Sequence, residues 1–441
     1  MNAQAKKRLV RGLVAAEARR IERVADSIAD LAEPGFGEVE SSRLLAGYLQ
    51  ERGFAVEWPW RHMPTAFKAA RGRGRPVVGL LAEYDALPNC GPREGTWGHG
   101  CGHNLLGAGS AAGAVAAAEA LAQRKLPGKV VLWGCPAEEI LAGKVYMARD
   151  GAFRRHDAIL SWHPGSSTRV CPKGGSSMDS VLFEFFGKTA HGAYAAAGRS
   201  ALDGVMLLDV AANYLREHVP ENVRIHMCIL DGGEAPNVVP AYAKAWYYVR
   251  GKDREQVDDV RKRLLACARG AATATETKLK VTRLAGCYSR LENAALAGLL
   301  DRNLRLFGPP RVTGRDRELV KALGKEPEFA AKVEAPSDSP GRGSSDEDNV
   351  SWLAPFGQFT VACVSKKDVT GHHRDYAAQM KLPHAHRGML RAAETLAAAV
   401  VDLCTTPRLL AKARAEFRKA TKSFRYDPLV PQHQKPPTHQ P

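Results

Sequence analysis

Short apolar segments alternate with a long Ala-rich segment in the first half of the chain, and each apolar segment runs into a polar turn. Residues 76–88 (PVVGLLAEYDALP) and 129–139 (KVVLWGCPAEE) are apolar, and residues 104–122 (NLLGAGSAAGAVAAAEALA) lie between them. This order predicts strand, helix and strand in an α/β sheet buried on both faces. Residues 157–165 (DAILSWHPG) supply a third strand. Because ligand sites in such sheets lie at the carboxyl ends of the strands, we expect the site in these turns.

Residues 181–286 follow a different pattern. Alternating segments and helical segments succeed one another there in the order β-α-β-β-α-β, which is typical of a ferredoxin-like unit. We therefore expect a separate domain inserted into a mixed-sheet α/β domain formed by residues 1–180 and 287–405. Residues 406–441 are basic and end in a Pro- and Gln-rich stretch, which predicts a disordered tail.

The charge balance raises one alternative function. In the 441 residues, 63 Lys and Arg stand against 47 Asp and Glu, so the net charge of +16 would suit a nucleic-acid-binding protein. The excess is greatest near the two ends, and no basic stripe is interleaved with aromatic residues, so solvated helix faces and a charged tail are the simpler interpretation. The nine cysteines lack paired spacing, which indicates reduced thiols and a cytoplasmic location. Residues 104–122 are too broken by Gly and Ser for a membrane span. No nucleic acid or membrane partner is expected.

The polar turns contain side chains that bind metals. Thiolate, imidazole and carboxylate together suit a first-row divalent ion, with zinc or manganese favoured over calcium. A late GHH sequence adds one more imidazole from His372 or His373. Five ligands are too many for one open tetrahedral site, which predicts two ions with a shared ligand. The candidates are Cys101, His103, Glu139, His163 and His372.

Glu138 and Glu139 are adjacent carboxylates at a strand end. Neighbouring side chains there point in opposite directions, so one can bind metal while the other holds water and acts as a general base. Each motif alone also has a structural explanation. A Cys-x-His pair is often coincidental, paired Glu residues often begin a solvated helix, and a Trp-His-Pro turn often serves packing.

The combination of motifs is more specific than its parts. CGHN, PAEE, SWHPG, GKTAHGA, GGEAPNVVP and GHH, in this order, resemble the metal-dependent aminoacylase and carboxypeptidase superfamily. The match is closest to its branch of amidohydrolases that includes hippurate hydrolases, auxin-conjugate hydrolases and the B subunits of aminobenzoyl-glutamate hydrolases. The resemblance extends from about residue 20 to residue 405.

The resemblance implies a role for each motif. Cys101 would bridge two divalent ions, Mn²⁺ or Zn²⁺, and His103, Glu139, His163 and the late histidine would complete their ligands. Glu138 would be the general base. The inserted domain would act as lid and dimerisation domain, so a homodimer or a higher homo-oligomer is expected.

Three further residues are assigned from the inserted domain. His191 of GKTAHGA matches a histidine that stabilises the oxyanion in relatives, often in the active site of the other subunit of the dimer. Alternatively, His191 orders the turn between a strand and a helix. Asn237 of GGEAPNVVP matches a residue on the substrate carboxylate side. Arg250, by its fork geometry, is a candidate carboxylate partner. The expected substrate is a small molecule with a carboxylate.

The chain departs from the family pattern at two places. Asn104 stands where relatives commonly have Asp, and the late motif continues as His372, His373, Arg374 where relatives have an aromatic residue. The glycine before this motif favours His372 as the ligand, with His373 left open. Asp85 either orients a ligand imidazole or caps a turn, and Asp346 either borders the site or lies in a polar turn.

These observations predict a binuclear metallohydrolase that cleaves a C–N bond. We expect the bond to be the amide of an N-acyl or N-aroyl amino acid of the aminobenzoyl-glutamate kind, with metal-activated water as the nucleophile. Hydrolytic deamination of an aromatic amino-carboxylic acid by the same site is one alternative. A non-catalytic binding protein on the same fold is another, but neither the ligands nor Glu138 are lost.

Overall fold

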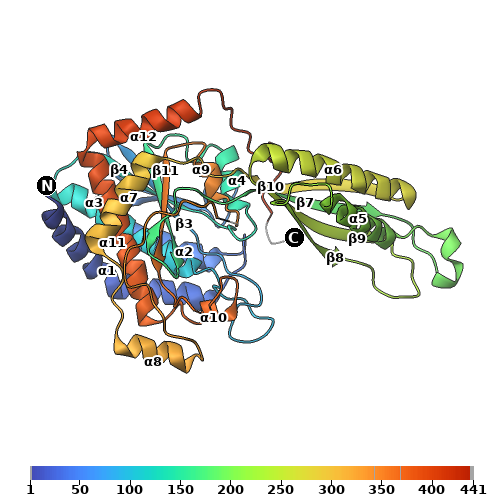
Figure 1. Ribbon diagram of the computed structural model, residues 1–441, viewed down its shortest axis with the longest axis horizontal. Helices are drawn as coiled ribbons and strands as arrows, with labels where there is room; N and C mark the ends of the chain where they lie inside the picture. The colour runs from blue at the N-terminus through green and yellow to red at the C-terminus, as the bar shows by residue number, and fades with distance from the viewer. Residues whose placement is uncertain (1, 342, 368, 438–441) are drawn as a thin grey trace.

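The computed structural model describes residues 2–341, 343–367 and 369–437, which form two parts of different architecture (Figure 1). We call residues 177–287 the inserted domain and the rest the main domain. The strands of the main domain are β1 (Ala55–Glu57), β2 (Phe67–Arg73), β3 (Val77–Ala82), β4 (Gly128–Gly134), β5 (Ala158–Gly165), β6 (Arg169–Val170) and β11 (Phe356–Ala362). Its helices are α1 (Ala3–Leu31), α2 (Val39–Glu51), α3 (His103–Gln123), α4 (Gly143–Arg149), α7 (Ala294–Phe307), α8 (Gly314–Ala322), α9 (Glu347–Val350), α10 (Arg374–Ala377), α11 (Pro383–Thr405) and α12 (Pro407–Ala420).

The main-domain sheet is mixed, with strand order β1-β2-β4-β3-β5-β11-β6. Strands β4, β3, β5 and β11 run parallel to one another in this series, whereas β1, β2 and β6 pair antiparallel. Separate apolar cores cover the two faces of the sheet, one with α1, α3, α7 and α11 and the other with α4 and residues 350–356. The strands buried on both faces therefore read as continuous apolar runs.

The Ala-rich segment forms the central helix α3, which packs against β3, β4, β5 and α11. A Cβ on Gly107 would lie 2.5 Å from the carbonyl oxygen of Glu83, and one on Gly109 would lie 2.7 Å from the Trp162 ring. The glycines thus let α3 approach the sheet closely. This helix is apolar and long enough to span a membrane, but 89% of its apolar window is buried inside the protein, as in a core helix.

The inserted domain has the order β7 (Ser177–Phe186), η1 (Gly192–Ala197), α5 (Ala201–Arg216), β8 (Arg224–Asp231), β9 (Tyr242–Gly251), α6 (Arg254–Ala274) and β10 (Lys278–Cys287). Its antiparallel sheet has the strand order β10-β7-β9-β8, and both helices pack against β7 and β9. This is the ferredoxin-like arrangement expected from the sequence. The predicted fold class, an α/β domain with an inserted α+β domain, is confirmed.

The C-terminal segment differs from the expected disordered tail. Residues 407–420 form α12, and the chain then returns to the junction of the two domains (Figure 1). Leu429 and Val430 are buried there, and the Gln434 amide donates hydrogen bonds to the Tyr146 hydroxyl and to the Arg283 carbonyl at 2.8 and 3.0 Å. Apolar side chains between the prolines supply the burial that orders this segment. Residues 438–441 of the predicted tail lie outside the described residues.

Candidate metal centre

The candidate ligands lie at the carboxyl ends of three parallel strands. Glu83 and Asp85 follow β3, Glu138 and Glu139 follow β4, and His163 lies near the end of β5. Because these strands are neighbours and run parallel, their carboxyl ends meet at one edge of the sheet. The helix α3 begins at the same edge, and Cys101 and His103 are at its start.

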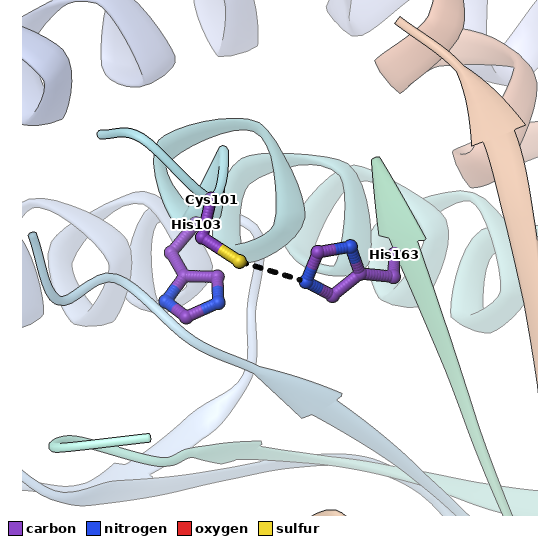
Figure 2. A group of neighbouring side chains, drawn as sticks. All are labelled: Cys101, His103 and His163. Atoms are coloured by element: carbon purple, nitrogen blue, oxygen red, sulfur yellow. Dashed lines mark hydrogen bonds between the residues drawn. The ribbon is translucent and has the colours of Figure 1, made fainter. Parts of the chain in front are cut away.

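Cys101, His103 and His163 form the first group of candidate ligands (Figure 2). Their ligand atoms all lie within 4.8 Å of one another, and the Cys101 Sγ is 3.4 Å from the His163 Nε2. Gly102 separates the first two ligands in the left-handed conformation, with φ +80°. A side chain at this position would be strained, so the glycine allows Cys101 and His103 to face the same point.

Two more groups share members with the first. Cys101 also groups with Glu139 and His372, and His103 groups with Glu83 and Glu138, by the same distance criterion. The structure therefore brings together all of the metal ligands expected from the sequence. Cys101 and His103 each belong to two of the three groups.

Asp85 holds two residues of this cluster in position through hydrogen bonds. Its Oδ1 lies 2.7 Å from His103 Nδ1, and its Oδ2 accepts a hydrogen bond from the Glu139 backbone N–H at 2.8 Å. His103 therefore presents Nε2 to the cluster, where it has no hydrogen-bond partner among the described residues. A carboxylate behind a ligand imidazole is a common arrangement in metal sites, and it corresponds to the first of the two roles that the sequence left open for Asp85.

The two late histidines have different surroundings. The His372 Nε2 lies 3.5 Å from Glu139 Oε2, and the backbone N–H of His372 donates to the Gly100 carbonyl. His372 also has a positive φ of 61°, which is uncommon for a residue other than glycine. The His373 side chain instead accepts a hydrogen bond from the Asp375 backbone N–H and caps α10.

Glu83 is a site residue that the sequence interpretation missed. Its Oε2 lies 3.3 Å from His103 Nε2, and its Oε1 lies 2.7 Å from the Nζ of Lys144, whose side chain is fully buried. Lys144 also contacts Asp346 at 2.5 Å. Glu83 and Asp85 are two apart at a strand end, which places both on the same face, and this spacing was the available signal.

Burial disfavours the charged form of several groups in the cluster. Burial, together with the nearby Glu83 and Glu139, raises the pKa of Glu138 well above its usual range. Burial likewise raises the pKa of Glu139 to about 8. Burial raises the pKa of the Cys101 thiol, and it lowers that of His163 to about 4. A divalent cation would stabilise the ionised carboxylates and thiolate and bind the neutral imidazole, so the donor set fits metal ions.

A cavity of about 590 Å³ opens beside the cluster. Its lining includes Cys101, Glu138, Glu139, His163 and His372. Arg250 reaches it from the inserted domain, and Glu347 lines it beside Asp346, which is itself fully buried. The pocket thus combines a candidate metal centre with the cationic side chain of Arg250.

His191 and Asn237 do not reach this pocket. They lie beside each other, since the Gly192 N–H donates to the Asn237 carbonyl at 2.7 Å, and both are exposed. The short helix η1 that follows His191 lies at the end of the inserted domain remote from the main domain (Figure 1). Within one chain the structure therefore separates these two residues from the other predicted site residues.

Comparison with known proteins is consistent with this architecture. Residues 174–276 match the peptidase dimerisation domain of the M20 family. The chain is 33% identical to a p-aminobenzoyl-glutamate hydrolase chain of Escherichia coli, over 97% of this chain and 98% of that protein. It is 29% identical to human Xaa-Arg dipeptidase, over 91% and 89%.

Solved structures share the fold. An aminobenzoyl-glutamate utilization protein from Klebsiella pneumoniae matches with a TM-score of 0.63 and 18% identity, covering 88% of this chain and 97% of that one. A dinuclear metal-binding M20 peptidase from Bacillus subtilis matches with a TM-score of 0.55 and 20% identity, over 88% and 99%. The chain is an enzyme of the M20 family of peptidases and amidohydrolases.

Proposed function

We propose that this enzyme uses two divalent metal ions to hydrolyse the amide bond of an N-acyl or N-aroyl amino acid of the aminobenzoyl-glutamate kind. The observation that carries the proposal is the overlap of two ligand groups at Cys101. One ion would be held by Cys101, His103 and His163, and the other by Cys101, Glu139 and His372. The E. coli relative that matches almost the whole chain is named for an aminobenzoyl-glutamate substrate.

Divalent ions held here would act as Lewis acids on the amide carbonyl and would lower the pKa of a water molecule. Glu138 lines the pocket, and its Oε2 lies 3.9 Å from His103 Nε2. Its raised pKa suits a group that takes a proton from water and returns it to the leaving nitrogen. Arg250 would hold the carboxylate of the substrate through its planar fork of donors.

We further propose a homodimer in which the partner chain supplies His191. Met206, Val210 and Tyr214 form an apolar stripe along the outer face of α5, and they are 49%, 47% and 76% exposed. The neighbouring β8 is an edge strand of the inserted sheet. Pairing through this face would bury the stripe and offers a way to bring an exposed His191 to the pocket of another chain.

We base the proposed location and metal on the chemistry of the cysteine and histidine side chains. All nine cysteines are free thiols, which supports a reducing compartment, and we propose the cytoplasm. Thiolate and imidazole ligands support manganese or zinc over calcium.

Metal content and hydrolysis, measured on one preparation, test this function. We expect about two Mn²⁺ or Zn²⁺ per chain and turnover of aminobenzoyl-glutamate within a panel that also contains hippurate, indoleacetyl-aspartate and an aminobenzoate. Glu138→Ala should keep the metal and lose about 10²- to 10⁴-fold in kcat. Glu94→Ala, at an exposed position, is the matched control. Absence of bound metal after reconstitution would refute the proposal.

A further inference from the structure

The register of the main-domain sheet aligns Arg169 with His163, a candidate metal ligand two strands away. In the strand register His163 of β5 is opposite Thr360 of β11, and Thr360 is opposite Arg169 of β6. Paired residues of neighbouring strands point to the same face, and all three side chains line the pocket. Two strand spacings place the backbone of Arg169 roughly 9.5 Å from that of His163.

Two cations that line the pocket, Arg169 and Lys173, have no short ion pair among the described residues. The nearest nitrogen of Arg169, Nη1, lies 3.7 Å from Glu334 Oε2. The Nζ of Lys366 lies 3.0 Å from Oε1 of the same carboxylate. The Nζ of Lys173 donates to the Asp338 backbone carbonyl. Arg290, in contrast, is neutralised by Asp348 at 2.6 Å. Three acids of the pocket lining, Glu83, Glu138 and Glu139, belong to the groups of candidate ligands, whereas Arg169 and Lys173 add positive charge to the lining outside these groups.

Two buried polar atoms of the pocket lining also lack hydrogen bonds. Within the described part of the chain, the Arg169 Nε and the Ser344 Oγ are buried without a partner. Both residues line the pocket. An arginine N–H and a hydroxyl are donors that a carboxylate can satisfy, and leaving them unpaired is unfavourable.

We propose that Arg169 and Lys173, assisted by Ser344, bind a second carboxylate of the substrate. Arg250 would hold one carboxylate from the inserted domain, and Arg169 would hold the other from the main domain. The amine product would then be a dicarboxylic amino acid of the glutamate type. This inference rests on the proposed function and assigns the substrate class of the same pocket.

The test compares two substrates that differ by one charge, p-aminobenzoyl-glutamate and p-aminobenzoyl-glutamine. The wild type should prefer the glutamate conjugate by about 10- to 100-fold in kcat/KM, mainly through KM. Arg169→Gln and Lys173→Gln should each reduce this preference, and the double variant should abolish it, with the larger loss on the glutamate conjugate. Lys366→Gln is the matched control, because it removes the other cation on Glu334 outside the pocket.

Equal turnover of both conjugates by the wild type, or a preference that survives in the double variant, would overturn the subsite. If neither conjugate is hydrolysed, the proposed function fails, and calorimetry with glutarate and glutaramate decides on the subsite alone. Tighter binding of glutarate that is lost in the double variant would support it. Equal binding of the two compounds would overturn it. Thermal unfolding of each variant shows whether the fold is retained.

Discussion

The Nζ of Lys144 lies 2.7 Å from the Oε1 of Glu83, and both side chains are buried at the base of the candidate metal centre. The same ammonium contacts Asp346 at 2.5 Å. Burial alone would lower the pKa of Lys144, but the two carboxylates outweigh it and raise the pKa well above its usual value. Lys144 is therefore charged, and it forms an ion pair with the Glu83 oxygen other than the one 3.3 Å from His103.

Replacing Lys144 should lower the free energy of unfolding. Lys144→Met leaves two buried carboxylates without their cation, so we expect a loss of about 3–5 kcal/mol in the free energy of unfolding. Urea or guanidinium denaturation of the metal-free protein measures it. Lys252→Met removes an exposed lysine whose nearest carboxylate is 3.8 Å away, and it should change stability by less than about 0.5 kcal/mol. Similar values for the two variants would contradict the buried network.

The two late histidines should differ in metal binding. His372 lies among the ligand atoms of Cys101 and Glu139, whereas His373 caps α10. We expect His372→Ala to weaken binding of one of the two ions by at least about 10-fold, because one ligand is lost. His373→Ala, the matched control, should keep both ions. Metal titration followed by elemental analysis measures the difference, and metal loss only in the His373 variant would reverse the assignment.

Mixing two inactive variants tests whether the partner supplies His191. If each pocket uses Glu138 of its own chain and His191 of the partner, a hybrid of Glu138→Ala and His191→Ala chains contains one intact pocket. Random re-pairing should then restore about one quarter of the wild-type activity. If both residues act within one chain, the mixture remains as inactive as its components. Size-exclusion chromatography confirms that both variants still dimerise.

Much of the site could be predicted because its residues follow strands that are evident from local sequence. The apolar runs ending near Glu83, Glu138 and His163 indicate parallel strands, and parallel strands bring their carboxyl ends together. The inserted domain was likewise evident from the order of its elements, although β7 begins at Ser177 and not at 181.

Other features depend on contacts between distant segments. Lys144 is on the short helix α4, where a lysine would normally face solvent, and only the return of residue 346 to this point buries it. Arg169 lines the pocket because β6 pairs with β11, which lies about 190 residues later in the chain. Local sequence patterns do not encode the register of such a distant pairing. The tail was misjudged because its composition is polar, whereas Phe424 packs against Trp352 with ring centroids 4.2 Å apart and ring planes inclined by 41°.

A half-buried histidine remote from the metal centre, His156, should make stability depend on pH. The Nδ1 of His156 donates to the Phe153 carbonyl, and its Nε2 accepts from the Trp133 indole N–H at 3.2 Å. Both bonds suit the neutral ring. Burial lowers the pKa of His156 to about 4, with Lys68 and Lys129 adding to the effect and Asp157 opposing it.

Between pH 6.5 and pH 4 the unfolded chain therefore binds a proton at His156 that the folded protein does not, and stability falls as the pH is lowered through this window. His156→Gln keeps a donor and an acceptor but does not titrate. We expect the wild type to lose on the order of 2 kcal/mol relative to this variant between about pH 7.5 and pH 4.5, as measured by urea unfolding. Other titrating groups are common to both proteins, so a difference that does not change with pH would show that His156 can be protonated in the folded state.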